Sequence, residues 1–567
     1  PAARGAPNGR AAAAVQAAAS SQPTATMPAM VTLAAFVATL GAVALTAGAA
    51  SHHDDVVRRT VTSSADSGPG TLREAIAFAN TAMARVVVTL ESDVRLITAL
   101  PEYTNDQPLT IDGECGTDDD DDDDGAVRGY ERDEDELVDD DDDRCEVRMA
   151  DAGEDYVVQN IFSSTSSASL AVRDVRLRGG ARALIVVAGD ARAASPSDTY
   201  VLALHNVLIT RAMSVNIDIR TDSTPVLIDA HDVLITDTPN NVVRVTAQSA
   251  GATVTTLLSN VVATKTARGF VVLIDAMDAV TVGVDESLFS GARPGNGLDL
   301  GISATDIELL VTESTCSDNG GGGLNFLGTL LGDGVVRVNV HKSIFSGNAA
   351  SGFRYLIGLP SDATVKAELV MDQVTAESNE QYGMVIQLPP NSPQSKVDVF
   401  LRHLNANQNA RSGIDLQREA SGGTVRVDHV QANHNGQAGL SVTATGQTNP
   451  LSLEVSSTEA SRNNITGIFV EQPAADALTV TLDKVVANNT ANGSGVSINI
   501  IGALPSGSGA NRVRFHGVAV SENAEDGVTI KRDAALVVAD GLASVVGSGN
   551  GDRLVDVVAG SNSVFVI

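Results

Sequence analysis

The stretch Asn409-Ala410-Arg411-Ser412-Gly413-Ile414-Asp415-Leu416 decides the fold, because its outline returns about every 29 residues through the C-terminal half of the chain. The most constant feature is a glycine that is followed at once by a large apolar residue. These glycines are Gly269, Gly297, Gly323, Gly352, Gly383, Gly413, Gly439, Gly467, Gly495 and Gly527. A fixed period of this size indicates structural repeats that stack on one another.

Most of these glycines have an asparagine four residues earlier. The asparagines are Asn319, Asn348, Asn379, Asn409, Asn435, Asn463 and Asn523. Asparagine and glycine are the residues that most readily adopt left-handed backbone conformations. The sequence therefore predicts a tight Asn-x-x-x-Gly turn in each repeat, with a positive φ at the glycine, and a short strand directly after it.

A second column of mostly apolar residues precedes the asparagines, and each member follows a polar residue or, once, a glycine. The column comprises Val207, Val233, Val261, Leu288, Thr315, Ile344, Val374, Leu404, Val430, Thr458, Val485 and Val518. Alternation of apolar and polar residues predicts a half-buried strand at this column. The sequence also predicts a third strand just before the column, as in residues 335–340. Three strands and three turns in each repeat predict a coil of a parallel β-helix, with about 13 coils over residues 169–534.

Two other repeat architectures fit the sequence less well. Arrays of helical repeats such as ankyrin have a similar period, but runs rich in Val, Ile and Thr with Gly and Asn between them favour strands. A β-propeller needs about 40 residues in each blade.

The N-terminal region predicts a lid for the first coil. Thr71 and Glu74 have the spacing of a capping box, and apolar residues recur on one helical face from Leu72 to Ala79. A β-helix begins with an open coil whose backbone and apolar interior need a cover. We expect a helix over residues 71–82 to provide it.

A resemblance to a known family rests on the same region. The run Asp66-Ser67-Gly68-Pro69-Gly70-Thr71-Leu72-Arg73-Glu74-Ala75-Ile76, followed by Leu109-Thr110-Ile111-Asp112-Gly113, resembles the N-terminal signature of secreted and surface right-handed parallel β-helix proteins. Those proteins share the pectin-lyase-like fold. The resemblance implies right-handed coiling, so the expected fold class is an all-β, right-handed parallel β-helix with an N-terminal capping helix.

Residues 1–50 are interpreted as an export segment. They form an Ala-rich leader and then an uncharged apolar run, which ends in small residues near Ala49 and Ala50. This is typical of a cleaved secretory signal, and the alternative is an uncleaved membrane anchor. Either would place the coils outside the cytoplasm. Cleavage would bring His52 or His53 to the third position of the mature chain, where it would hold Cu(II) or Ni(II).

Residues 114–146 form an acidic insert between the first coils (51–113) and the remaining coils (147–567). Cys115 and Cys145 bracket it, which predicts a disulfide in an exported protein, whereas Cys316 is expected to be a buried apolar residue. Inside the insert, the calcium-loop spacing predicts a calcium site, and the alternative is a solvated, self-repelling tract. The candidate calcium ligands are Asp120, Asp122, Asp124 and Glu131.

No catalytic constellation stands out. In the column after the glycines, Arg354 and Asp415 are two coils apart with apolar Val385 between them, which is an ordinary mixed face. His403 and His429 are expected on adjacent outward positions, where solvated histidine is the simpler interpretation than a metal site. The chain has no Trp and only 3% aromatic residues, whereas sugar-binding clefts usually need aromatic surfaces. Loops at 356–363, 387–395 and 501–509 would wall a groove.

These observations leave two functional classes. The first is a non-enzymatic extracellular rod, acting as a surface, adhesive or matrix protein that contacts polysaccharide, a cell surface or other copies end to end, with calcium as a bridging ion. The second is a secreted polysaccharide lyase, hydrolase or epimerase, which only fold analogy favours. The net charge of −32 argues against nucleic acid as a partner.

Overall fold

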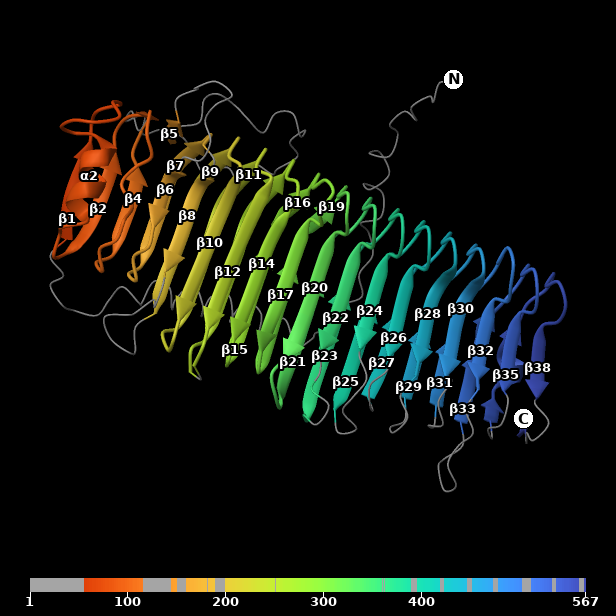
Figure 1. Ribbon diagram of the computed structural model, residues 1–567. Helices are drawn as coiled ribbons and strands as arrows, with labels where there is room; N and C mark the ends of the chain where they lie inside the picture. Colours follow the sequence, from red (N-terminus) through yellow and green to blue (C-terminus); the bar gives the residue numbers. More distant parts are fainter. Residues whose placement is uncertain are drawn as a thin grey trace, which may run out of the picture. The chain divides into compact units, whose positions relative to one another are not determined.

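The computed structural model describes residues 56–115, 144–149, 160–180, 182–188, 199–249, 251–358, 360, 363–388, 395–418, 423–445, 451–472, 478–501, 511–532, 537–559 and 565–566. Their strands run parallel and wind into a β-solenoid of about 15 coils (Figure 1). This confirms the predicted β-helix. In each complete coil, three lines of strand segments alternate with three turns.

The strands of the first line pair in parallel with their equivalents in the next coil, as Ile307 pairs with Val336. Its members are β1 (Val56–Val61), β2 (Arg85–Leu90), β4 (Leu109–Gly113), the first halves of β7 (Leu170–Arg178), β9 (Tyr200–Thr210), β11 (Val226–Thr236) and β13 (Val254–Thr264), then β15 (Ala279–Asp285), β18 (Asp306–Thr312), β21 (Gly334–His341), β23 (Val365–Asp372), β25 (Lys396–Arg402), β27 (Gly423–Asp428), β29 (Leu451–Ser456), β31 (Leu478–Asp483), β33 (Asn511–His516), β36 (Val537–Asp540) and β39 (Phe565–Val566).

The second line is the shortest. It comprises β3 (Val94–Leu96), β5 (Cys145–Met149), the second halves of β7, β9, β11 and β13, then β16 (Leu288–Ser290), β19 (Thr315–Ser317), β34 (Val518–Ala519) and β37 (Val545–Val546), with the 3₁₀ helix η2 (Leu542–Ser544) just before β37. Between β19 and β34 the line continues as single bridged residues, such as Thr375 with Asn405.

The third line is a separate 15-stranded parallel sheet, and the repeating glycines precede most of its strands. Its members are β6 (Asn160–Ser164), β8 (Arg182–Ala188), β10 (Ser214–Thr221), β12 (Asn240–Ala247), β14 (Phe270–Ala276), β17 (Leu298–Ala304), β20 (Leu324–Leu330), β22 (Phe353–Gly358), β24 (Met384–Leu388), β26 (Ile414–Arg418), β28 (Ala438–Ala444), β30 (Thr466–Gln472), β32 (Val496–Ile500), β35 (Val528–Arg532) and β38 (Val555–Ala559).

The core runs along the axis of the solenoid, because every second side chain of each strand points inward. Equivalent apolar residues stack from coil to coil, as Ile386, Leu416 and Val442 do, all fully buried. Phe326 and Tyr355 stack inside with ring centroids 5.5 Å apart. Burial of like residues on like residues is what keeps successive coils in register.

The lid is the helix α2 (Leu72–Ala79), which lies at the N-terminal end of the stack (Figure 1). The side chain of Thr71 accepts a hydrogen bond from the Glu74 N–H at 3.3 Å, and the Glu74 carboxylate accepts one from the Gly70 N–H at 2.7 Å. This confirms Thr71 as the N-cap, but the Glu74 carboxylate bonds the residue before the N-cap, and the helix ends at Ala79, short of the expected residue 82. The buried residues of α2 are Leu72, Ala75, Ile76 and Ala79, which are the apolar face expected from the sequence.

The sequence predicted that the repeating glycines are needed for a positive φ, and this reason is wrong. In the Asn-x-x-x-Gly turn before β26, the left-handed residue is Gln408, with φ 59°, and not Asn409 or Gly413. A Cβ atom on Gly413 would lie 2.5 Å from the carbonyl oxygen of Ala406 and 2.8 Å from that of Gly439. Glycine is needed there because neighbouring backbone approaches closely. Only Gly269, of the ten repeating glycines, has a positive φ, of 70°.

The asparagines form a buried hydrogen-bond ladder. The N–H and Nδ2 of Asn379 both donate to Oδ1 of Asn409, at 3.1 and 3.0 Å. The rungs present are Asn319, Asn348, Asn379, Asn409, Asn435, Asn463, Asn523 and Asn550. Thr490 takes the rung before Asn523, to which its hydroxyl donates at 2.9 Å. Thr490 and Asn550 were not predicted as members.

The second apolar column is wrong at three coils. Ser287, Ser314 and Ser343, which are at most 2% exposed, take the inward position that was expected for Leu288, Thr315 and Ile344. In these coils the residue with a left-handed conformation comes one position earlier, relative to the second column, than it does in the other coils. The inward position of the turn moves one residue earlier with it. The serines tolerate burial because each hydroxyl donates to a backbone carbonyl two residues before it, at 2.8 to 2.9 Å.

Candidate functional site

A polar groove lies on the outer face of the third sheet, across β20, β22, β24 and β26, with a cavity volume of about 290 Å³. Strand pairing aligns two rows of side chains along it. The first row runs through Asn325, Arg354, Val385 and Asp415. The second row contains Gln387 and Gln417 on β24 and β26. Because equivalent strands of successive coils lie side by side, their outward-facing residues form one continuous surface.

A relay of hydrogen bonds joins the two charged residues of the groove. Arg354 Nη2 donates to Gln387 Oε1 at 3.5 Å, Gln387 Nε2 donates to Gln417 Oε1 at 3.0 Å, and Gln417 Nε2 donates to Asp415 Oδ2 at 2.8 Å. Asp415 is 6% exposed, whereas Arg354 is exposed. Arg354 and Asp415 were read from the sequence as an ordinary mixed face, and the structure brings both into one groove.

Polar groups at the two ends of the groove are also held in place. At one end, Asp299 Oδ1 accepts hydrogen bonds from Asn296 Nδ2 at 2.6 Å and from Asn325 Nδ2 at 2.9 Å. At the other end, Tyr382 lines the groove, and Arg411 donates to its hydroxyl at 3.2 Å with the guanidinium 5.3 Å from the ring centroid. These side chains are ordered by contacts within the protein before any ligand arrives.

The chemistry of the groove suits recognition. Amide groups both donate and accept hydrogen bonds, as sugar hydroxyls do, and Tyr382 supplies an aromatic surface. Among the described residues that line the groove, Asp415 is the only carboxylate. Glycoside hydrolysis generally uses a pair of carboxylates, and a second carboxylate, Asp299, lies at one end of the groove, bonded to the lining residues Asn296 and Asn325.

The acidic insert leaves the solenoid at a single turn. In the coil that follows, the single residue Asp174 makes the equivalent turn, with φ 52°. This follows from the strand pairing, in which Asp112 pairs with Arg173 and Cys145 pairs with Val175. Cys115 and Cys145 form a disulfide with their Cα atoms 5.0 Å apart. The disulfide therefore closes the coil at the point where the insert interrupts it. Cys316 is buried, and burial raises the pKa of its thiol.

The candidate calcium ligands Asp120, Asp122, Asp124 and Glu131 lie outside the described residues, so the calcium site stays a prediction. In the part of the chain that is described, no group of three or more His, Cys, Asp or Glu side chains is arranged to hold a metal ion. The expected loops at 356–363, 387–395 and 501–509 are described only in part.

The export segment, residues 1–50, also lies outside the described residues. Within them, no helix is both long and apolar enough to cross a membrane. No protein-family model matches the sequence, and no curated protein is significantly similar to it. The pectin-lyase-like resemblance of the capping motif therefore stays an interpretation, while the β-solenoid itself is shown by the structure.

Proposed function

We propose that the protein is a non-enzymatic, extracellular β-helix rod of the pectin-lyase-like kind that binds polysaccharide in the polar groove. The observation that carries the proposal is the relay from Arg354 through Gln387 and Gln417 to Asp415. It holds charged and neutral hydrogen-bonding groups in fixed positions along one face. Successive coils repeat these groups at about 4.8 Å, so the groove suits an extended polymer better than a compact small molecule.

The resemblance of residues 66–76 to secreted and surface β-helix proteins supports the extracellular setting. The Cys115–Cys145 disulfide agrees with that setting, because disulfides persist mainly in oxidising compartments. The acidic insert would add calcium-bridged contacts to an acidic partner, since a divalent ion relieves the repulsion between carboxylates. Display and adhesion are the roles that these features serve.

Binding to an array of neutral and acidic polysaccharides, with quantification by calorimetry, tests the proposal. We expect the double variant Gln387→Ala/Gln417→Ala and the single variant Arg354→Ala to lose binding at least about tenfold, because each removes a hydrogen bond to the ligand. Asn216→Ala is the matched control, since Asn216 faces outward from β10 on the same sheet but outside the groove. Equal affinity in all three variants would overturn the proposal.

The alternative is a secreted polysaccharide lyase, hydrolase or epimerase. The position of Asp415 in the groove favours it, because a carboxylate that lines a binding cleft is a common general base. The same polysaccharide panel separates the two functions when new reducing ends and unsaturated products are measured. Turnover that disappears in Asp415→Asn would replace the binding rod with an enzyme.

A further inference from the structure

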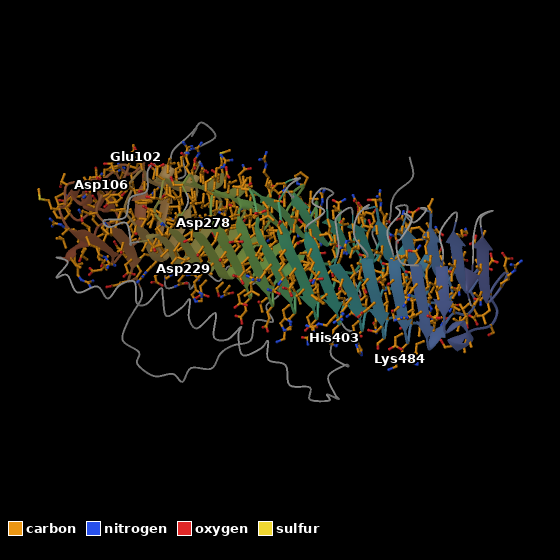
Figure 2. All side chains as sticks on the ribbon, turned by 90° about the horizontal axis from the view of Figure 1, so that it is seen from below. Glu102, Asp106, Asp229, Asp278, His403 and Lys484 are labelled. Atoms are coloured by element: carbon orange, nitrogen blue, oxygen red, sulfur yellow. A yellow bond between two sulfur atoms is a disulfide. The ribbon has the colours of Figure 1, made fainter. Side chains whose placement is uncertain are left out.

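Six of the seven described histidines lie at one corner of the solenoid, where the first line of strands turns into the second. We call this line of residues the histidine corner; it comprises His205, His231, His341, His403, His429 and His516. Each of these rings has a nitrogen within 4 Å of an aspartate oxygen. In Figure 2, Asp229, His403 and Lys484 lie along the same long edge of the solenoid.

His403 and His429 are the closest pair of rings at this corner. They take the same left-handed position in successive coils, with φ 51° and 53°. Their ring centroids are 5.2 Å apart, with 32° between the ring planes. Both side chains are about half exposed, at 52% and 56%, so a solute ion reaches the rings without any movement of the coils.

A carboxylate orients each of the two rings through Nδ1. His403 Nδ1 lies 2.8 Å from Asp372 Oδ1, and His429 Nδ1 lies 3.0 Å from Asp428 Oδ1. Asp428 is itself held by the Ser456 hydroxyl, which donates to it at 2.7 Å. A carboxylate on Nδ1 places the proton there and leaves the Nε2 lone pair free. Within the described residues, no hydrogen bond to either Nε2 is found.

This arrangement is the one that metal-bound imidazoles use, in which the second ring nitrogen donates to a carboxylate. Two imidazoles bound to one tetrahedral Zn²⁺, with Zn–N distances of about 2.0–2.1 Å, have ring centroids about 5 Å apart. The observed 5.2 Å, which the spacing of successive coils sets, is compatible with this separation. Asp372 and Asp428 add negative charge nearby, which favours a cation over a neutral ligand.

We propose that His403 and His429 bind one divalent transition-metal ion, such as Zn²⁺ or Cu²⁺, through their Nε2 atoms. Imidazole nitrogen selects these ions over Ca²⁺ and Mg²⁺, which prefer oxygen ligands. Two protein ligands leave coordination positions for water or for a donor from another molecule. Because the site has two ligands and not three, it is consistent with the lack of any larger cluster among the described residues.

The same corner contains a natural comparison pair. In His205 and His231 the carboxylates contact Nε2 and not Nδ1: His205 Nε2 lies 3.0 Å from Asp229 Oδ2, and His231 Nε2 lies 2.9 Å from Asp232 Oδ2. Their rings are 6.3 Å apart and nearly perpendicular, at 86°. The Nε2 atoms of this pair are therefore engaged, and its rings lie farther apart than two imidazoles on one ion, so it does not form an equivalent site.

The test is calorimetric titration of the full chain with Zn²⁺, together with the electron paramagnetic resonance spectrum of bound Cu²⁺. All proteins carry His52→Ser and His53→Ser, and the buffer contains excess Ca²⁺, so that neither the N-terminal histidines nor the acidic insert contributes. Variants are His403→Asn, His429→Asn and, as the matched control, His205→Asn. Asparagine adopts the left-handed region more readily than most side-chain-bearing residues, and Asn206 and Asn260 occupy this position naturally.

We expect one ion per chain, and a loss of affinity of more than about tenfold in His403→Asn and His429→Asn. In these two variants, the nitrogen splitting in the electron paramagnetic resonance spectrum of bound Cu²⁺ should change from that of two coordinated nitrogens to that of one. Asp372→Asn should weaken binding by about 10–100-fold, as the loss of an orienting carboxylate does at other metal sites, and His205→Asn should bind as the parent does. Equal binding in the parent and His403→Asn, or an equal loss in His205→Asn, would overturn the proposal. Melting temperatures verify that each variant is folded.

Discussion

Asn409 and Asn435 are joined by two hydrogen bonds that end on the same atom: the N–H and the Nδ2 of Asn409 both donate to Oδ1 of Asn435, at 3.0 and 3.1 Å. Asn409 accepts the equivalent pair from Asn379 on its other side. Each side chain is at most 2% exposed. The ladder thus satisfies backbone groups that the turn would otherwise leave unpaired in the interior.

The first prediction concerns this ladder. Asn409→Ala removes the acceptor of two donors of Asn379, and burying an unpaired donor costs about 1–3 kcal/mol each. We expect the free energy of unfolding in urea to fall by about 2–6 kcal/mol. Gln431→Ala is the control, because Gln431 is an exposed residue on a neighbouring turn. A fall of the same size in both variants would show that the ladder contributes nothing specific.

The second prediction separates close packing from backbone conformation at the repeating glycines. Gly413→Ala should destabilise by about 1–3 kcal/mol or more, as overpacking against rigid atoms does, because two backbone carbonyl oxygens lie under 3 Å from the added Cβ. Gly332→Ala should leave stability unchanged or slightly raised, since nothing lies within 4 Å of a Cβ there. Chemical denaturation of both variants measures the difference, and equal midpoints would contradict it.

The sequence predicted the coil and the lid because both depend on local, periodic information. The alternation of apolar residues and the Thr71–Glu74 box leave few other structures open. The conformation of the turn was predicted less well. Asparagine either adopts the left-handed region or hydrogen-bonds through its side chain, and the local sequence is the same in both cases. Only the contacts between coils show that Asn409 hydrogen-bonds through its side chain, while the neighbouring Gln408 adopts the left-handed conformation.

The relay of side chains in the groove could not be predicted, for a different reason. Gln387 and Gln417 are 30 residues apart, whereas Asn409 and Asn435 are 26 apart. Coils of unequal length make the register between outward side chains uncertain until the turns are placed. The glutamine relay therefore had no detectable signal beyond two polar residues that follow apolar ones. Charge and polarity were visible in the sequence, but their convergence was not.

The third prediction concerns acid stability of the lid. Burial alone would raise the pKa of Asp66, but hydrogen bonds from Arg73, Ile97 and Thr98 outweigh it and hold that pKa below its ordinary value. A group with a lowered pKa in the folded state stabilises the protein above its unfolded pKa, of about 3.9, and this stability is lost as the pH falls through the folded value.

We therefore expect the protection of α2 and β1 against hydrogen exchange, relative to the intrinsic rate at each pH, to fall below about pH 4, ahead of protection in the central coils. Asp66→Asn should exchange faster at neutral pH and lose much of this acid sensitivity. An unchanged exchange rate in the variant at neutral pH would show that the Asp66 carboxylate does not anchor the lid.

The fourth prediction concerns calcium. Because seven consecutive aspartates supply ligands at almost any spacing, the informative positions are Gly125 and Glu131. We expect calorimetry on the oxidised full chain to give a dissociation constant of about 10⁻⁴ to 10⁻³ M, the range of weak extracellular sites. The double variant Asp120→Ala/Glu131→Ala should abolish it. Binding that persists in this variant would identify the insert as a diffuse polyanion.

The fifth prediction concerns the disulfide that closes the interrupted coil. Cys115 and Cys145 are 30 positions apart, and closing a loop of this length stabilises a protein by about 3–4 kcal/mol in the chain-entropy model. Because each coil of a solenoid interacts only with its neighbours, reduction should destabilise α2 and the strands β1 to β7 and leave β20 to β35 unchanged.

Hydrogen exchange with and without reductant resolves the two regions within one molecule. The double variant Cys115→Ala/Cys145→Ala is the control, since reductant should not affect it, and it should match the reduced parent. If the N-terminal coils of the parent exchange at the same rate in both conditions, the contacts of β4 and β5 with β7 hold the coil closed without the disulfide.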